Sequence, residues 1–198
     1  MEERSALADW AAPRLERLSP GRRAHCLAVA RLAARWAPRW GVASGDAYAA
    51  GLVHDLAREW DGPALLREAE RLGWPVGEAE RASPILLHGP VAAGWVREAG
   101  VGSPAIEAAV RYHTTAAPSL DALGRLVFIA DALEPGRAYA GVDALRRVAE
   151  ADGAAGYRAV LASTRSYLAA RGIPVHPRTA AAWAQVAGEG RAEEEAPS

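Results

Sequence analysis

The sequence has no lysine, only one cysteine and no long hydrophobic run. All 23 basic residues are arginine, which excludes Schiff-base chemistry on a lysine and a phosphate-binding loop built around one. Cys26 alone cannot form an intrachain disulfide, so we expect a reducing, cytoplasmic setting. No apolar run approaches membrane-spanning length, and the first ten residues lack the apolar core of a signal peptide.

The charge is nearly balanced. A formal net charge of −1 provides no basic surface for nucleic acid or an anionic membrane, so we expect neither as a partner. The length of 198 residues and the hydrophobic content of 51% fit one globular domain.

Segments rich in Ala, Leu, Arg and Glu, broken by Gly and Pro, predict an all-α fold. Ser19-Pro20 and Ser103-Pro104 are typical helix starts, with serine as the cap and proline in the first turn. We expect one domain over residues 1–187 and a charged, structureless tail over 188–198. The predicted helices span residues 20–37, 46–59, 61–73, 85–99, 103–114, 120–133, 142–151 and 155–171, with a last one from Pro177.

Several polar residues share helical faces with apolar ones. His25, for example, lies on one face with Val29 and Leu32, at spacings of four and seven. Taken singly, such a residue is more often a satisfied core group than a ligand. Together, these residues can satisfy one another through a metal ion, since imidazole and carboxylate suit Fe, Zn or Mn. The complete set is His25, His54, Asp55, His88, His113 and Asp131.

The order H…HD…H…H…D resembles the HD-domain superfamily of metal-dependent phosphohydrolases, which are all-α helical bundles. Further motifs follow in order: "RRAH", "AAGLVHDLAR", "ILLHGPVAA", "IEAAVRYHTT", "LGRLVFIADALEPGR", "GVDALR" and "GIPVHP". Together they resemble the YqeK family, the symmetrical bis(5'-nucleosyl)-tetraphosphatases.

This resemblance implies an iron site formed by His25, His54, Asp55 and Asp131, although Mn, Mg or Zn would also be compatible. His88 and His113 would face the same pocket, either binding a second ion together with Asp55 or contacting phosphate. A bound cation lowers the pKa of its water and takes up charge on a phosphoryl oxygen.

Three arginines are placed to hold a polyphosphate, because their planar guanidinium groups bind phosphate in a bidentate manner. Arg22 lies one turn before His25, Arg58 follows His54 by four residues, and Arg137 follows the Asp131 helix. Arg58 stands where the family commonly has lysine. The alanine after the two threonines of "HTTAAP" stands where glycine is usual.

The resemblance further suggests that "GIPVHP" closes over the nucleotide, with His176 stacking on a base or hydrogen-bonding to it. The alternative is a connector between helices in which His176 is a capping residue. The expected catalytic residues are Asp55, Arg58, His88 and His113. The expected substrate contacts are Arg22, His25, Arg58, His88, His113, Thr114, Asp131, Arg137, Gly172, Ile173, Pro174, Val175, His176 and Pro177.

The leading hypothesis is symmetrical hydrolysis of diadenosine tetraphosphate to two ADP. A second keeps the site but changes the substrate to a nucleoside triphosphate, a cyclic dinucleotide or a phosphomonoester. A di-iron oxygenase and a non-catalytic nucleotide sensor are further alternatives. The sequence leaves open whether the chain forms a homodimer.

Overall fold

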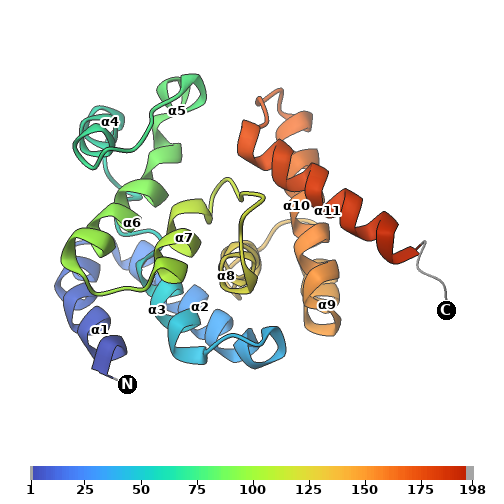
Figure 1. Ribbon diagram of the computed structural model, residues 1–198, viewed down its shortest axis with the longest axis horizontal. Helices are drawn as coiled ribbons and strands as arrows, with labels where there is room; N and C mark the ends of the chain where they lie inside the picture. Colours follow the sequence, from blue (N-terminus) through green and yellow to red (C-terminus); the bar gives the residue numbers. More distant parts are fainter. Residues whose placement is uncertain (1, 195–198) are drawn as a thin grey trace.

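The computed structural model describes residues 2–194, and this part of the chain contains helices but no strand (Figure 1). The all-α prediction is therefore confirmed. The α-helices are α1 Glu2–Leu15, α2 Pro20–Trp36, α3 Ser44–Val53, α4 Gly62–Arg71, α5 Glu78–Ala82, α6 His88–Ala99, α7 Pro104–Tyr112, α8 Ala122–Leu133, α9 Val142–Ala151, α10 Gly153–Ala170 and α11 Pro177–Glu194, and two 3-10 helices span Ala37–Trp40 (η1) and Pro84–Leu87 (η2).

Side-chain caps begin the helices where the sequence predicts them. The Ser19 hydroxyl accepts the backbone N–H of Arg22, and the Ser103 hydroxyl accepts that of Ile106. A residue at the cap satisfies an amide that has no partner inside the helix. α2, α4, α7, α8, α9 and α10 follow the predicted ranges to within a few residues.

Three features of the fold differ from the prediction. α1 and the short α5 were not expected. The helix predicted over residues 46–59 ends at Val53, and hydrogen-bonded turns continue from there to residue 60. α11 continues to Glu194, through part of the segment 188–198 that was expected to lack structure, while residues 195–198 lie outside the described residues.

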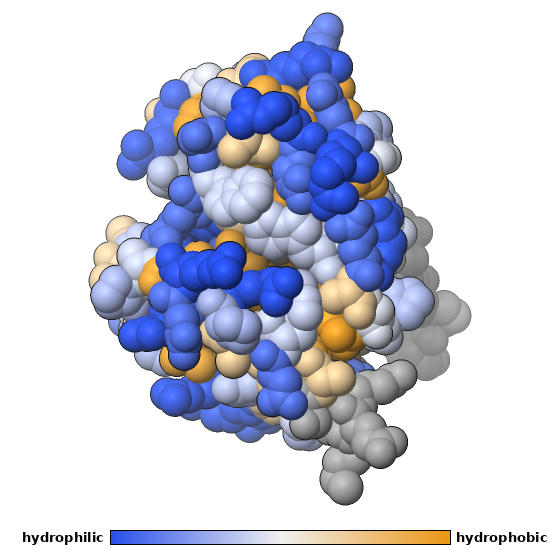
Figure 2. Space-filling view, turned by 90° about the vertical axis from the view of Figure 1, so that its left-hand side faces the viewer, coloured by the Kyte–Doolittle hydropathy of each residue, from blue (hydrophilic) through white to orange (hydrophobic). Residues whose placement is uncertain are grey.

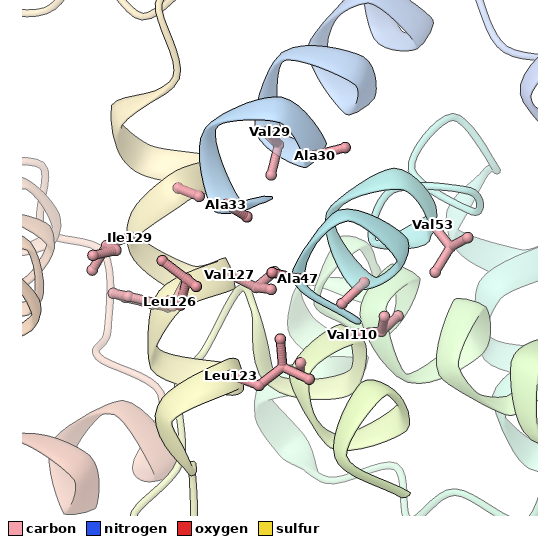
Figure 3. Packing of buried hydrophobic residues seen from close by; sticks show 14 of the residues in the cluster. Val29, Ala30, Ala33, Ala47, Val53, Val110, Leu123, Leu126, Val127 and Ile129 are labelled. Atoms are coloured by element: carbon pink, nitrogen blue, oxygen red, sulfur yellow. The ribbon is translucent and has the colours of Figure 1, made fainter. Parts of the chain in front are cut away.

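The main core lies where α2, α3, α7 and α8 meet, and Figure 3 shows their alanine, valine and leucine side chains in close contact. Gly51 makes this approach feasible. A methyl group at Gly51 would lie 2.8 Å from the Cα atom of Ala30, so only glycine lets α3 pack this tightly on α2. The close packing brings the part of α2 that carries His25 beside the end of α3.

A second apolar cluster joins α4 and α6 through buried leucines, among them Leu65 and Leu87. On the side of α8 that faces α10, Phe128 packs edge to face on Tyr157 of α10. α11 lies next to α10 (Figure 1). No helix in the described range is long and apolar enough to cross a membrane.

Candidate metal centre

Six side chains from three helices and from the turns that follow two others converge at the centre of the molecule. His25 and Asp131 lie within α2 and α8, and Nε2 of His25 is 3.0 Å from Oδ1 of Asp131. His54 and His113 directly follow the last residues of α3 and α7, and His88 is the first residue of α6. Asp55 lies between these groups. Every residue of the predicted metal set is therefore brought together.

The local structure around His54-Asp55 corrects the expectation that the pair sits inside a helix. The segment after Val53 forms tighter turns, in which the N–H of Leu56 bonds to the carbonyl of Val53 and the N–H of Arg58 to that of Asp55. The helical spacing that places Arg58 over the site therefore does not hold. Among the described residues, the Arg58 side chain has no hydrogen bond or ion pair.

The imidazole rings are oriented by the same local device at three positions. Nδ1 of His54 lies 2.7 Å from the carbonyl oxygen of Gly51, and Nδ1 of His113 lies 2.7 Å from that of Val110. Nδ1 of His88 has the same relation to the carbonyl of Ile85. A carbonyl can only accept, so each Nδ1 carries a proton and each Nε2 faces the centre of the cluster.

Asp55 joins two halves of the cluster. Its Oδ2 lies 3.6 Å from Nε2 of His25 and 3.5 Å from Nε2 of His54, and its Oδ1 lies 3.1 Å from Nε2 of His88 and 3.5 Å from Nε2 of His113. Candidate ligand atoms of Asp55 form one group with His25 and His54 and another with His88 and His113, each within 4.8 Å.

Adjacent imidazole nitrogens indicate that a cation fits between them. Nε2 of His88 and Nε2 of His113 are 2.9 Å apart, and those of His25 and His54 are 3.3 Å apart. His88 and His113 both have Nδ1 committed to a carbonyl, so their facing Nε2 lone pairs repel each other unless a cation or proton lies between them. Divalent metal sites are typically built from such nitrogen and oxygen donors, with each imidazole held in place by a further hydrogen bond.

The electrostatics favour ionised carboxylates. Burial alone would raise the pKa of Asp55, but His54, His113 and His88 hold that pKa far below its usual range. Burial opposes the charged form of Asp131 as well, yet the hydrogen bond from His25 keeps its pKa below the usual value. Burial lowers the pKa of His88, which favours its neutral, metal-binding form. The cluster therefore offers two negative charges to a cation at neutral pH.

Two of the predicted arginines lie at the edge of this cluster. Arg22 donates from Nη1 to Oδ2 of Asp55 at 2.6 Å, and Arg137 donates from Nη2 to Oδ1 of Asp131 at 2.5 Å. The Thr114 hydroxyl lies 3.2 Å from Nε2 of His88 and 3.1 Å from Nε2 of His113. These groups surround the ligands on the side where Arg22 and Arg137 remain partly exposed.

Glu134 is a site residue that the sequence reasoning did not single out. Its side chain is buried, and Oε1 lies 3.2 Å from Nδ1 of His25, which orients that ring as the carbonyls orient the other three. Its other oxygen accepts the N–H of Gly136. The available signal was the position of Glu134 in "EPGR", directly after the helix that carries Asp131.

The loop after His113 keeps a backbone shape that favours glycine. Ala116 has φ of 55°, and it is the only residue other than glycine with a positive φ in the described range. Ala116 is the alanine after the two threonines of "HTTAAP", at the position where glycine is usual in the family that the sequence resembles. The chain therefore retains the left-handed turn at the cost of some steric strain.

The "GIPVHP" segment is occupied by contacts within the protein. His176 is buried, its Nε2 lies 3.1 Å from Oε1 of Glu80, and its Nδ1 accepts the N–H of Arg178 at the start of α11. This geometry matches the capping alternative for His176. Gly172 ends α10 with φ of 65°, and Ile173 is exposed. Nucleotide contacts by residues 172–177 stay a prediction.

Comparisons with known proteins agree with this geometry. The family model of the HD domain matches residues 22–136. The chain is 33% identical over 165 residues to a Bacillus subtilis protein named "Bis(5'-nucleosyl)-tetraphosphatase, symmetrical", covering 83% of this chain and 88% of that protein. A Halalkalibacterium halodurans protein of the same name is 28% identical over 176 residues, covering 85% and 90%. A crystal structure of a predicted HD superfamily hydrolase involved in NAD metabolism, from Clostridium acetobutylicum, superposes with a TM-score of 0.87 at 28% identity, over 92% of this chain and 97% of that one.

Proposed function

The chain belongs to the HD-domain family, and on this premise we propose that it is a metal-dependent hydrolase that cleaves diadenosine tetraphosphate symmetrically into two ADP. The observation that carries the proposal is the convergence of four Nε2 atoms on the carboxylates of Asp55 and Asp131. We infer the substrate from the relatives, which are named symmetrical bis(5'-nucleosyl)-tetraphosphatases.

In this proposal His25, His54, Asp55 and Asp131 hold the first cation. The facing pair His88 and His113 either completes a second site with Asp55 or contacts phosphate. We propose iron, because a set of four imidazoles and two carboxylates without thiolate suits Fe, and Mn or Zn would fit the same donors. Mg²⁺ fits less well, since it prefers an octahedron of oxygen ligands.

The chain's own side chains would hold the polyphosphate. Arg22 and Arg137 each have part of the guanidinium group exposed beside a carboxylate of the cluster. Because a cation bound to those carboxylates would compete with the arginines for their oxygens, both guanidinium groups would become available to phosphate. Thr114 can donate its hydroxyl hydrogen to a phosphoryl oxygen at the same edge. Arg58, with no partner among the described residues, is available for the same role.

When bound, the divalent cation would supply an activated water and take up developing charge on the phosphoryl group. The residues provide the fixed geometry that this chemistry requires. His54, His88 and His113 are held by backbone carbonyls and His25 by Glu134, so their Nε2 atoms need little reorganisation.

The test is product analysis. Purified protein, prepared without chelator and supplied with Fe²⁺ or Mn²⁺ under anaerobic conditions, is incubated with diadenosine tetraphosphate, and the nucleotides are separated by chromatography. We expect ADP as the only product. ATP and AMP in equal amounts would exclude symmetrical cleavage. Turnover without oxygen would also exclude the oxygenase alternative.

A further inference from the structure

A hollow of about 750 Å³ has a volume suited to a nucleotide-sized ligand. Its walls come from the end of α1, the turn after Asp55 and the second half of α6. Leu56, the residue next to Asp55, forms part of the wall. Figure 2 faces this side of the molecule and shows pale and orange surface between strongly hydrophilic patches.

An aromatic platform stands in this hollow. Trp60 is 43% exposed, although the other tryptophans of the wall are partly buried. Its ring rests edge to face on Trp95, with centroids 4.9 Å apart, and the indole N–H of Trp95 donates to Glu68 at 2.6 Å. The contact with Trp95 therefore fixes the orientation of the Trp60 ring. A fixed and exposed indole face binds a nucleobase by stacking without losing much side-chain entropy.

The wall of the hollow carries two arginines and two glutamates, and the arginines are the groups that can hold an anionic ligand. Arg14 donates to the backbone carbonyl of Trp10, and Arg17 is exposed at the end of α1. Within the described residues, neither guanidinium group is paired with a carboxylate. Both acids of the wall are already engaged, Glu59 by Ser19 and Glu98 by Arg71. Two cations thus remain available beside the aromatic surface.

A short chain of contacts joins the hollow to the metal centre. Glu59 accepts the N–H and the hydroxyl of Ser19, the Ser19 hydroxyl accepts the N–H of Arg22, and Arg22 binds Asp55. Glu59 lines the hollow and Asp55 belongs to the candidate metal ligands, so these hydrogen bonds connect the wall of the hollow to the metal centre.

We propose that this hollow binds one nucleoside end of a dinucleoside polyphosphate, with its base stacked on Trp60 and the adjoining phosphate beside Arg14 and Arg17. The inference rests on the proposed function, because it needs a substrate that extends away from the metal centre. It supplies an exposed base-binding surface, whereas the ring of His176 is buried and both of its nitrogens have protein partners.

The pocket has a consequence for specificity. Both wall carboxylates already accept hydrogen bonds from protein donors, so we expect stacking rather than the hydrogen-bonding edge of the base to dominate its recognition. Stacking on an indole face is tolerant of base identity, because every base has a π face. The pocket therefore accepts adenine and guanine ends to a similar extent.

The test uses calorimetric titration of the full-length, metal-loaded chain with two probes. The first is a diadenosine tetraphosphate analogue with a methylene group at the central bridge, which resists symmetrical cleavage. The second is inorganic tripolyphosphate, which has no base. We expect Trp60→Ala to lower the affinity for the analogue by about ten-fold. The affinity for tripolyphosphate should stay within about two-fold of the wild-type value. Trp60→Phe, which keeps an aromatic face, restores most of the affinity.

Tyr167→Ala is the matched control, because Tyr167 is a similarly exposed aromatic residue on α10, outside the hollow. An unchanged affinity of Trp60→Ala for the analogue, or an equal loss for both probes, overturns the pocket assignment. Failure of the wild type to cleave diadenosine tetraphosphate while it still binds the analogue overturns the proposed function and leaves the pocket. Failure of the wild type to bind the analogue overturns both.

Discussion

Replacing Asp55 with asparagine tests the metal centre at the residue on which both halves depend. Asparagine keeps the size of the side chain and removes its charge. The carboxylate is almost fully buried and has histidine nitrogens on both sides, with Nε2 of His88 at 3.1 Å from Oδ1 and Nε2 of His54 at 3.5 Å from Oδ2. Asp55 belongs both to the candidate ligand group with His25 and His54 and to the group with His88 and His113, and a further group joins His54, His113 and Asp131.

The expected loss follows from the charge removed. At an effective dielectric constant of about 20, a unit charge about 4 Å from another is worth about 4 kcal/mol. A divalent cation bound directly by the carboxylate would interact with it by at least this energy. Four kcal/mol corresponds to about a thousand-fold in an equilibrium or a rate, so Asp55→Asn should lower metal affinity and kcat/KM by about 10³ or more.

The assay combines metal analysis by mass spectrometry with hydrolysis of diadenosine tetraphosphate, and circular dichroism checks the fold. Asp143→Asn is the matched control, because that carboxylate is 77% exposed and pairs with Arg146 at the surface. A surface pair contributes about 0–1 kcal/mol, so this variant should retain metal and activity. An Asp55→Asn protein with full metal content and wild-type turnover would refute the assignment of this cluster as the metal centre.

Three further predictions follow from particular contacts. Glu134→Gln removes the carboxylate that orients His25 and should weaken metal binding by about 10- to 100-fold in competition with a chelator, and an unchanged affinity would show that Glu134 has no such role. Gly51→Ala places a methyl group 2.8 Å from the Cα of Ala30 and should lower stability by about 1–3 kcal/mol in urea, whereas Gly21→Ala in the open first turn of α2 should not. The hydrogen bond from His176 holds the pKa of Glu80 below its usual value against the opposing effect of burial, so the charged acid stabilises the fold above about pH 4.3 and this contribution is lost as the pH falls further. Urea unfolding should therefore find Glu80→Gln less stable than wild type at pH 7 and the difference smaller in acid, and a constant difference down to pH 3 would contradict the linkage.

The predictions that succeeded depend on signals carried by neighbouring residues. Ser19 and Ser103 cap the helices that they were expected to begin, because capping involves groups only three residues away. The inward position of His25 follows from helical spacing, which is equally local. α1 had a comparable signal in Leu7, Ala11 and Leu15, which lie four residues apart and are all buried. This four-residue spacing of apolar side chains is the local signal from which α1 is predictable.

The features that were missed depend on distant partners. Glu134 meets His25 across 109 residues, and Glu80 meets His176 across 96, so no local pattern identifies either acid as buried. The turn after Val53 is a different case. Its Leu, Ala, Arg and Glu residues favour a helix, but α3 ends where His54 must face four other ligands, and tertiary packing overrides the intrinsic preference.

The positions of His54 and His113 explain why two of the proposed metal ligands lie at helix C-termini. The last carbonyls of a helix have no partner within it, and the Nδ1–H of a histidine at the cap satisfies the carbonyl three residues before it. One contact thus completes the helix end and directs Nε2 outward. The C-terminal ends of α3 and α7 also carry partial negative charge toward the cluster, which favours a cation there. A histidine placed one turn earlier would lose the free carbonyl, the fixed tautomer and the favourable end of the helix together. The turn that interrupts the predicted helix at His54 is therefore what directs its Nε2 into the cluster.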